Sequence, residues 1–202
     1  MQQGAFLQLT NGKGNLYTVE IVDGNRKKCV VHVKESLTMA PPLNDINIGI
    51  SIIKNTSRFE WFLEKATEIG VRQVLPVICE RTEKTAFKAE RLNNILISAM
   101  LQSQQCWLPV LHSPAPFNKI VKESTHQQKF IAHCTEDVKQ ALATVNDVLL
   151  TSKLILIGPE GDFTDSEIEY ALANNFKAVA LGSTRLRTET AGIVAAILLC
   201  NL

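Results

Sequence analysis

Two loops in the last third of the chain, each following a short apolar run, constrain the fold more than any other feature. The run Lys153–Ile157 leads into Gly158-Pro-Glu-Gly161, and the run Ala178–Leu181 leads into Gly182-Ser-Thr-Arg185. A helix signal follows each loop, so we expect both loops to open at the carboxyl ends of neighbouring strands. In open α/β sheets this edge is where ligands bind.

Short strands and helices alternate from Ile46 onward, which is typical of a mostly parallel α/β sheet. The other strand-like runs are Ile46–Ile53, Val71–Cys79 and Lys129–Cys134, and helical spacing covers Phe59–Ile69 and Lys88–Gln105. Gly70 suits the position after the first of these helices. Thr164 and Glu167 form a capping-box pattern, which predicts the start of a further helix.

The first forty residues predict a small antiparallel β unit. Apolar runs are separated there by Asn11-Gly12 and Asp23-Gly24, which are strong hairpin signals. The Ala40-Pro41-Pro42 stretch marks a boundary, because proline neither continues a strand ladder nor fits a helix interior. We therefore expect a β domain over residues 1–42 and an α/β domain over residues 43–202.

Composition narrows the setting in which the chain works. Its 202 residues, 46% of them hydrophobic, suffice to bury a core. The five cysteines are scattered and odd in number, which predicts free thiols, no metal site and a reducing, cytoplasmic location. The apolar run Ala191–Leu202 is shorter than the ~20 residues that a membrane span needs, so we expect no membrane association.

The loop around Glu160 indicates what kind of ligand it suits. Neither a GxGxxG motif nor a Walker lysine motif follows any strand, and Glu160 would repel a phosphate. Glycines at 158 and 161 allow a ligand to approach the backbone closely. S-adenosylmethionine, with ribose hydroxyls, an adenine edge and a sulfonium cation, fits this description. The alternative is a tight turn that carries a solvated glutamate.

Two arginines, Arg185 and Arg187, stand just before the next helix. Cations are unfavourable at a helix start unless they pair with an anion. Glu189, Glu160 and an external anion such as an RNA phosphate are the candidates.

These motifs together resemble a known family. Ile157-Gly-Pro-Glu-Gly-Asp-Phe163 and Leu181-Gly-Ser-Thr-Arg-Leu-Arg-Thr-Glu-Thr-Ala191 are similar to the bacterial 16S rRNA uridine-N3 methyltransferases of the SPOUT superfamily. Upstream, Glu64–Val71 and Gln102-Ser103 match that family's middle motifs in the same order. The resemblance, which runs from about Phe6 to the end, implies a PUA-like β domain, a trefoil-knotted α/β domain and a homodimer whose interface borders the cofactor site.

The resemblance also implies an S-adenosylmethionine site and a ribosomal RNA substrate in the small subunit. The residues expected to contact the cofactor are His133, Cys134, Ile157, Gly158, Glu160, Gly161, Leu181, Gly182, Leu186, Arg187 and Thr190. Related sequences commonly have a second glycine where Asp162 stands. They also usually carry another strand and a basic segment before Phe6, so we expect a shortened β domain.

Catalysis requires uridine N3 to lose its proton while it is aligned with the methyl donor. We assign to Arg187 the electrostatic stabilisation of the uridine anion, with Arg185 as its substitute. Glu68 and Glu189 are the candidate general bases, although a structural role is expected for each. The cations that are candidates for phosphate contacts are Lys54, Arg58, Lys65, Arg81 and Arg91.

Two alternatives remain open at this point. The first is a SPOUT methyltransferase that acts on a ribose 2′-hydroxyl or on tRNA. The second is a non-catalytic RNA-binding factor of ribosome assembly.

Overall fold

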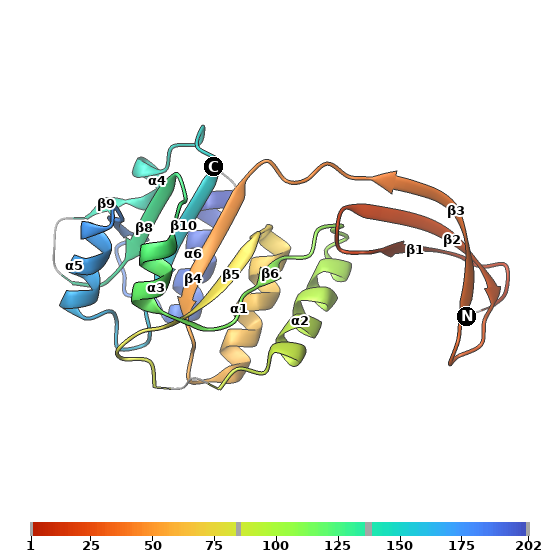
Figure 1. Cartoon of the computed structure of the whole chain (residues 1–202), viewed down its shortest axis with the longest axis horizontal. Helices are drawn as coiled ribbons and strands as arrows, with labels where there is room; N and C mark the ends of the chain where they lie inside the picture. The colour runs from red at the N-terminus through yellow and green to blue at the C-terminus, as the bar shows by residue number, and fades with distance from the viewer. Residues whose placement is uncertain (1, 84–85, 136–138, 201–202) are drawn as a thin grey trace. The chain divides into compact units, whose positions relative to one another are not determined.

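The chain divides into two compact units (Figure 1). The computed structural model describes residues 2–83, 86–135 and 139–200, and the ends of the predicted domain ranges, 1 and 201–202, lie outside them. The first unit combines the residues up to Pro42 with Met100–Leu108. The second combines Leu43–Ala99 with the residues from Pro109 onward. The sequence pattern gives no sign that Met100–Leu108 belongs to the first unit.

The first unit is a three-stranded antiparallel sheet, as its hairpin signals predict. Its strands, in the order β1-β2-β3, are β1 (Phe6–Thr10), β2 (Asn15–Asp23) and β3 (Val30–Thr38). Trp107 packs over Gly14, where a Cβ atom would lie 2.4 Å from the indole ring, and its Nε1 donates a hydrogen bond to the Ala40 carbonyl at 3.1 Å. This contact explains why the later segment belongs to the β unit.

The second unit is built on a parallel sheet, which confirms the predicted α/β architecture. Its strands are β4 (Asp45–Ser51), β5 (Gln73–Ile78), β6 (Val110–Leu111), β7 (Ala115–Pro116), β8 (Gln128–Ala132), β9 (Gln140–Ala141), β10 (Ser152–Ile157) and β11 (Lys177–Ala180). The order is β6-β5-β4-β10-β8-β11-β9, with β7 also paired to β5. Its helices are α1 (Thr56–Ile69), α2 (Ala89–Gln102), α3 (Phe117–Glu123), α4 (Leu142–Val145), α5 (Asp165–Ala173) and α6 (Thr188–Cys200), and the last residues of α2, from Met100, belong to the first unit.

The strand order corrects one expectation. β10 and β11 are not neighbours, because β8 pairs in parallel with both of them and lies between them. β10 is itself inserted between β8 and β4. The loop after β8 is therefore placed between the two glycine-containing loops, a position that local sequence pattern does not encode.

Helices cover both faces of this sheet. On one face, α3 and α5 share a core with β5, β8 and β10, which includes Leu156, Phe117 and Phe163. On the other face, α6 packs against α1, β4 and β10. Gly192 permits this approach, since a Cβ atom there would lie 2.6 Å from the ring of Phe62 on α1.

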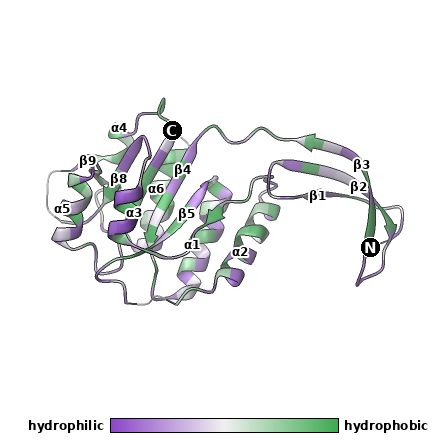
Figure 2. Ribbon diagram, in the orientation of Figure 1, coloured by the Kyte–Doolittle hydropathy of each residue, from purple (hydrophilic) through white to green (hydrophobic). Residues whose placement is uncertain are grey.

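The helix ends follow local chemistry. Gly70 adopts a left-handed conformation with φ +102° and closes α1, as predicted. Thr164 and Glu167 form the predicted capping box at the start of α5. The predicted helix over 88–105 ends earlier, at Gln102, and Gln104 has φ +56°. Figure 2 shows hydrophobic and hydrophilic residues on different faces of α1 and α2, as expected for helices with one side on a core.

Among the described residues, no helix is both long enough and apolar enough to span a membrane. All five cysteines are free thiols, as predicted, and Cys79 and Cys106 are buried.

Candidate functional site

Two adjoining cavities open at the carboxyl ends of β8, β10 and β11. The larger has a volume of about 460 Å³ and lies between the loop after β10 and the start of α6. The smaller, of about 290 Å³, lies between the loops after β8 and β11. The residues that line both cavities are Ala132, Cys134, Arg185, Leu186 and Ala191. The two sequence loops thus meet at one site, as predicted.

The loop after β10 is fixed by its own backbone and by Arg81. Gly158 packs against Phe163, whose ring would lie 3.1 Å from a Cβ atom at position 158. Arg81 donates hydrogen bonds to the carbonyls of Gly161 at 2.8 Å and of Phe163 at 3.4 Å. The Arg81 guanidinium therefore braces this loop.

Glu160 places a carboxylate on the wall of the larger cavity. Its side chain is exposed and lines the cavity, and its Oε1 accepts a hydrogen bond from the backbone N–H of Lys54 at 3.2 Å. A carboxylate in this position favours a cationic ligand and opposes a pyrophosphate.

The start of α6 contributes a buried carboxylate. Glu189 has 7% of its surface exposed and lines the larger cavity, and its Oε1 lies 3.6 Å from Nε of Arg58. Of the three anions left open for Arg185 and Arg187, Glu189 is paired with Arg58 instead. In the described part of the chain, Arg185 and Arg187 are exposed and form no ion pair. Both arginines line the larger cavity, so their charge is available to a ligand.

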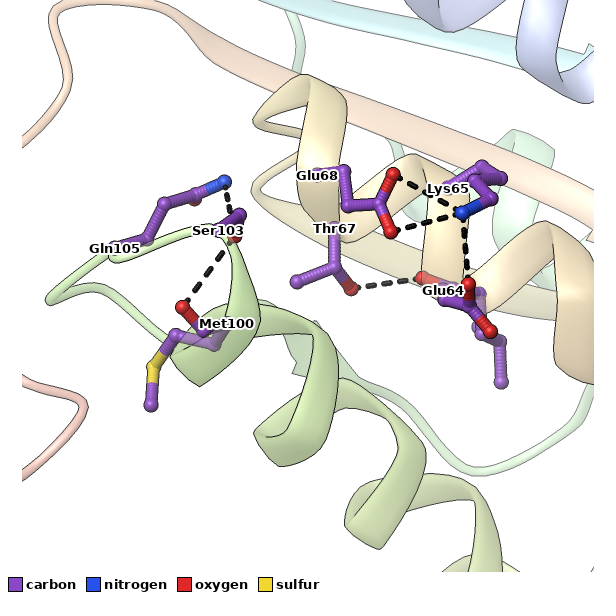
Figure 3. A network of polar contacts seen from close by, with 8 residues as sticks. Glu64, Lys65, Thr67, Glu68, Met100, Ser103 and Gln105 are labelled. Atoms are coloured by element: carbon purple, nitrogen blue, oxygen red, sulfur yellow. Dashed lines mark hydrogen bonds and ion pairs between the residues drawn. The ribbon is translucent and has the colours of Figure 1, made fainter.

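The five predicted phosphate contacts all have partners within the protein. Arg58 pairs with Glu189 and Arg81 donates to backbone carbonyls, as described above. The other three cations form ion pairs: Lys54 with Glu83 at 2.6 Å, Lys65 with Glu64 and Glu68, and Arg91 with Glu60. Figure 3 shows Lys65 on α1 between the carboxylates of Glu64 and Glu68. The same view shows Ser103 hydrogen-bonded to the Met100 carbonyl at 3.3 Å and to Gln105 at 3.1 Å, at the end of α2. The hydrogen bonds that the Lys65 ammonium donates to Glu64 and Glu68 raise its pKa above the ordinary value.

Most of the predicted cofactor contacts lie on these cavities. Those that line one or both are His133, Cys134, Ile157, Gly158, Glu160, Leu181, Gly182, Leu186 and Arg187. Gly161 and Thr190 do not line either cavity; Gly161 packs against the side chain of Arg81 and Thr190 lies in the first turn of α6. Of the two candidate bases, Glu189 lines the larger cavity and Glu68 does not.

Sequence reasoning missed two charged residues of the site, Asp162 and Lys139. Asp162 lines the larger cavity and Lys139 the smaller one. Asp162 has a positive φ of +63°. The glycine that the resemblance leads one to expect at this position was the only signal in the sequence. No motif marks Lys139.

A parallel sheet with β10 inserted between β4 and β8, and with a ligand-sized cavity at the strand ends, is the SPOUT fold that this chain shares with RNA methyltransferases of known structure. The fold class predicted from the sequence, a mostly parallel α/β sheet accompanied by a small β sheet, is therefore confirmed. Residues 40–200 match the RNA methyltransferase domain, and the chain belongs to that family.

Relatives of this chain agree with the family assignment. A ribosomal RNA small subunit methyltransferase E from Rickettsia conorii is 28% identical over 94% of this chain and 78% of its own length. A probable rRNA methyltransferase from Porphyromonas gingivalis is 40% identical, with a TM-score of 0.91 over 97% of this chain and 84% of that one. A ribosomal RNA small subunit methyltransferase E from Neisseria gonorrhoeae, bound to S-adenosyl methionine, is 27% identical, with a TM-score of 0.86 over 98% and 84%.

Proposed function

We propose that this protein transfers a methyl group from S-adenosylmethionine to N3 of a uridine in small-subunit ribosomal RNA. The observation that carries the proposal is the cavity at the tips of β8 and β10. The carboxylate of Glu160 lines it together with two arginines, Arg185 and Arg187, that form no ion pair in the described chain. The Neisseria relative, which is named as a small-subunit rRNA methyltransferase and bound to S-adenosyl methionine, supports both the cofactor and the substrate.

The residues of the cavity fit this cofactor. Its volume of about 460 Å³ falls in the range of ~300–1,000 Å³ typical of small-molecule sites. When bound, S-adenosylmethionine supplies an electrophilic methyl group on a sulfonium centre. Glu160 offers negative charge to a cation, and Gly182 leaves room for close backbone approach, since nothing described lies within 4 Å of a Cβ atom built there. His133, Leu181 and Leu186 would form the remaining walls.

The reacting uridine must be deprotonated and its anion stabilised. Arg187 is assigned to the anion, because its guanidinium lines the larger cavity and has no ion pair among the described residues. Arg185, which lines both cavities, is the substitute if the loop rotates. Glu189 is the better candidate to accept the N3 proton, since Glu68 is held by Lys65 on α1 outside the cavities.

The small β unit is assigned to RNA binding, as a PUA-like domain over residues 1–42. Five cations remain assigned to phosphate contacts with the RNA: Lys54, Arg58, Lys65, Arg81 and Arg91. An RNA phosphate would compete for each of them with its partner inside the protein. Exchange of one partner for another is common where charged side chains are exposed, because exposed ion pairs are weak.

We further assign the active form to a homodimer that works in the cytoplasm, where ribosomal subunits are assembled. The apolar helix α6 supports self-association. Ile197 has 45% of its surface exposed although it belongs to a helix that is apolar along most of its length. A helix of that composition is normally covered on all sides.

The direct test uses the full chain, small subunits that lack the modification, and cofactor labelled in its methyl group. Mass spectrometry of the digested RNA should find the label in 3-methyluridine. Label in a 2′-O-methyl nucleoside, or label found only when tRNA replaces the small subunits, would support the first alternative. Absence of both cofactor binding and transfer would favour a non-catalytic assembly factor.

The assignment of Arg187 is tested in the same assay. We expect Arg187→Ala to lower kcat by about 100-fold, since one donor aimed at a developing anion typically contributes that much. Its affinity for the cofactor should change by less than about tenfold. Lys177→Ala, which removes an exposed cation at the start of β11, is the matched charge control. Transfer by Arg187→Ala within a small factor of wild type would show that the assignment is wrong.

A further inference from the structure

Asp162 has a backbone conformation that disfavours most side chains. Its φ of +63° lies in the left-handed region, where glycine is at ease and most other residues are strained. The backbone N–H of Asp162 donates to the Pro159 carbonyl at 2.9 Å, which closes the turn after β10. The turn therefore needs positive φ at this position but does not by itself need a carboxylate.

The carboxylate of Asp162 joins two loops. Its Oδ2 accepts a hydrogen bond from the backbone N–H of Cys134 at 2.7 Å, and its Oδ1 accepts one from the N–H of Phe163 at 2.8 Å. Cys134 follows β8, whereas Phe163 follows β10. The Asp162 side chain thus links the loop after β8, which lies between the two glycine loops, to the loop after β10.

Lys139 holds the same wall from the other side. Its Nζ donates hydrogen bonds to the carbonyl of His133 at 2.8 Å and to that of Thr135. The His133 carbonyl and the Cys134 N–H belong to one peptide group. That peptide therefore has a carboxylate at its N–H end and an ammonium at its carbonyl end.

This arrangement fixes the orientation of the His133–Cys134 peptide. A flip would turn its carbonyl toward the carboxylate of Asp162 and its N–H toward the ammonium of Lys139, so both charges oppose a flip. His133 lines the smaller cavity and Cys134 lines both cavities. The orientation of one peptide consequently shapes the wall that the two cavities share.

We infer that Asp162 is a positioning residue, which holds the His133–Cys134 peptide in the orientation that accepts S-adenosylmethionine. The inference rests on the proposed function, because it takes the cofactor as the ligand of these cavities. Without the carboxylate, the peptide samples other orientations. The apparent Kd for the cofactor then rises in inverse proportion to the fraction of molecules that hold the competent orientation.

The test compares Asp162→Gly with Asp165→Asn in the full chain. Glycine suits φ +63°, so Asp162→Gly should fold, and its melting temperature should fall because the hydrogen bonds to Cys134 and Phe163 are lost. We expect its Kd and KM for S-adenosylmethionine to rise about tenfold, while kcat at saturating cofactor stays within about twofold, because bound cofactor restores the competent orientation. Asp165→Asn removes the same charge from the exposed first turn of α5 and should bind as wild type does.

Two further variants sharpen the result. Asp162→Asn tolerates the same φ and keeps one acceptor, so its affinity should lie between those of wild type and Asp162→Gly. Lys139→Met should weaken binding in the same direction. The double variant Asp162→Gly/Lys139→Met should bind more tightly than the product of the two single effects predicts, since both residues act on one peptide.

Hydrogen exchange without any ligand separates this inference from the proposed function. The Cys134 amide should exchange at least about tenfold faster in Asp162→Gly than in wild type. Unchanged exchange at Cys134, or cofactor affinity within twofold of wild type, would overturn the positioning role. Failure of the wild-type chain to bind the cofactor, with accelerated exchange in the variant, would instead count against the proposed function alone.

Discussion

The thiol of Cys79 shows how the core changes the chemistry of a single side chain. Cys79 follows β5 and is 5% exposed, in the core between the sheet and the helices α3 and α5. Burial first, and then the negative charge of Glu167, raise the pKa of this thiol to about 12. The thiol therefore keeps its proton in the folded protein at pH values where it ionises in the unfolded chain.

This pKa predicts a loss of stability at alkaline pH. Above the ordinary pKa of 9.0 the unfolded chain binds fewer protons than the folded one, so the free energy of unfolding falls as pH rises. The Cys79 thiol should account for a loss of about 1 kcal/mol between pH 9 and 10, and the loss continues toward the folded-state pKa.

Urea denaturation at pH 8, 9 and 10 measures this effect. Between pH 9 and 10 the Cys79→Ala variant should lose about 1 kcal/mol less stability than wild type, whatever its stability at pH 8. Cys29→Ala, which alters an exposed thiol, should follow the wild-type slope. Equal slopes in wild type and Cys79→Ala would contradict the assigned cause.

At the scale of elements, close packing between α1 and α6 depends on one glycine. A Cβ atom at position 192 would lie 2.6 Å and 2.9 Å from ring atoms of Phe62 and 3.1 Å from Ile50. Phe62 is fully buried, and Ile50 lies in β4, so neither has room to move away. The sequence of α6 alone gives the opposite expectation, because alanine favours helices by about 1 kcal/mol over glycine.

We therefore expect Gly192→Ala to destabilise the protein by about 1–3 kcal/mol, as overpacked cores generally do. Chemical denaturation followed by circular dichroism measures the change. The compensating double variant Gly192→Ala/Phe62→Leu should recover part of the loss, since leucine removes the ring atoms that an added methyl group meets. A Gly192→Ala protein as stable as wild type would mean that α1 and α6 are able to separate freely.

The elements also show what sequence alone is able to predict. Local rules correctly predict most strands and helices, the αL end of α1 at Gly70 and the capping box at Thr164, because these depend on neighbours within a few residues. The insertion of β10 between β4 and β8 depends on how the chain threads, which hydrophobic periodicity does not encode. The bond from Cys134 to Asp162 spans 28 residues and exists only because β8 lies beside β10.

At the scale of the whole molecule, the candidate site combines local and distant contributions. Both glycine loops were evident from the sequence, and each lines a cavity. The partner of Glu189 was not evident from the sequence, because Arg58 lies in the first turn of α1, more than a hundred residues earlier. Motifs therefore identify the ligand-facing backbone, whereas the pairing of charges around it requires the tertiary structure.

The proposed homodimer gives a prediction for the assembled molecule. If α6 contributes to the contact between copies, its exposed residue Ile197 lies in that contact. A glutamate at this position would lose its hydration in the dimer, which weakens the contact. We expect Ile197→Glu to raise the dimer dissociation constant at least about tenfold, which corresponds to ~1.4 kcal/mol. Sedimentation velocity over a range of protein concentrations measures this change, and circular dichroism checks that the variant remains folded.

Leu172→Glu provides the matched control for this experiment. Leu172 is 44% exposed on α5, and α5 covers the face of the sheet opposite to α6. The Leu172→Glu variant should self-associate as wild type does. This result would separate a specific contact at α6 from general aggregation of exposed apolar residues. A wild-type chain that sediments as a monomer at all concentrations would contradict the homodimer. A dimer that Ile197→Glu leaves intact would place the contact between copies away from this part of α6.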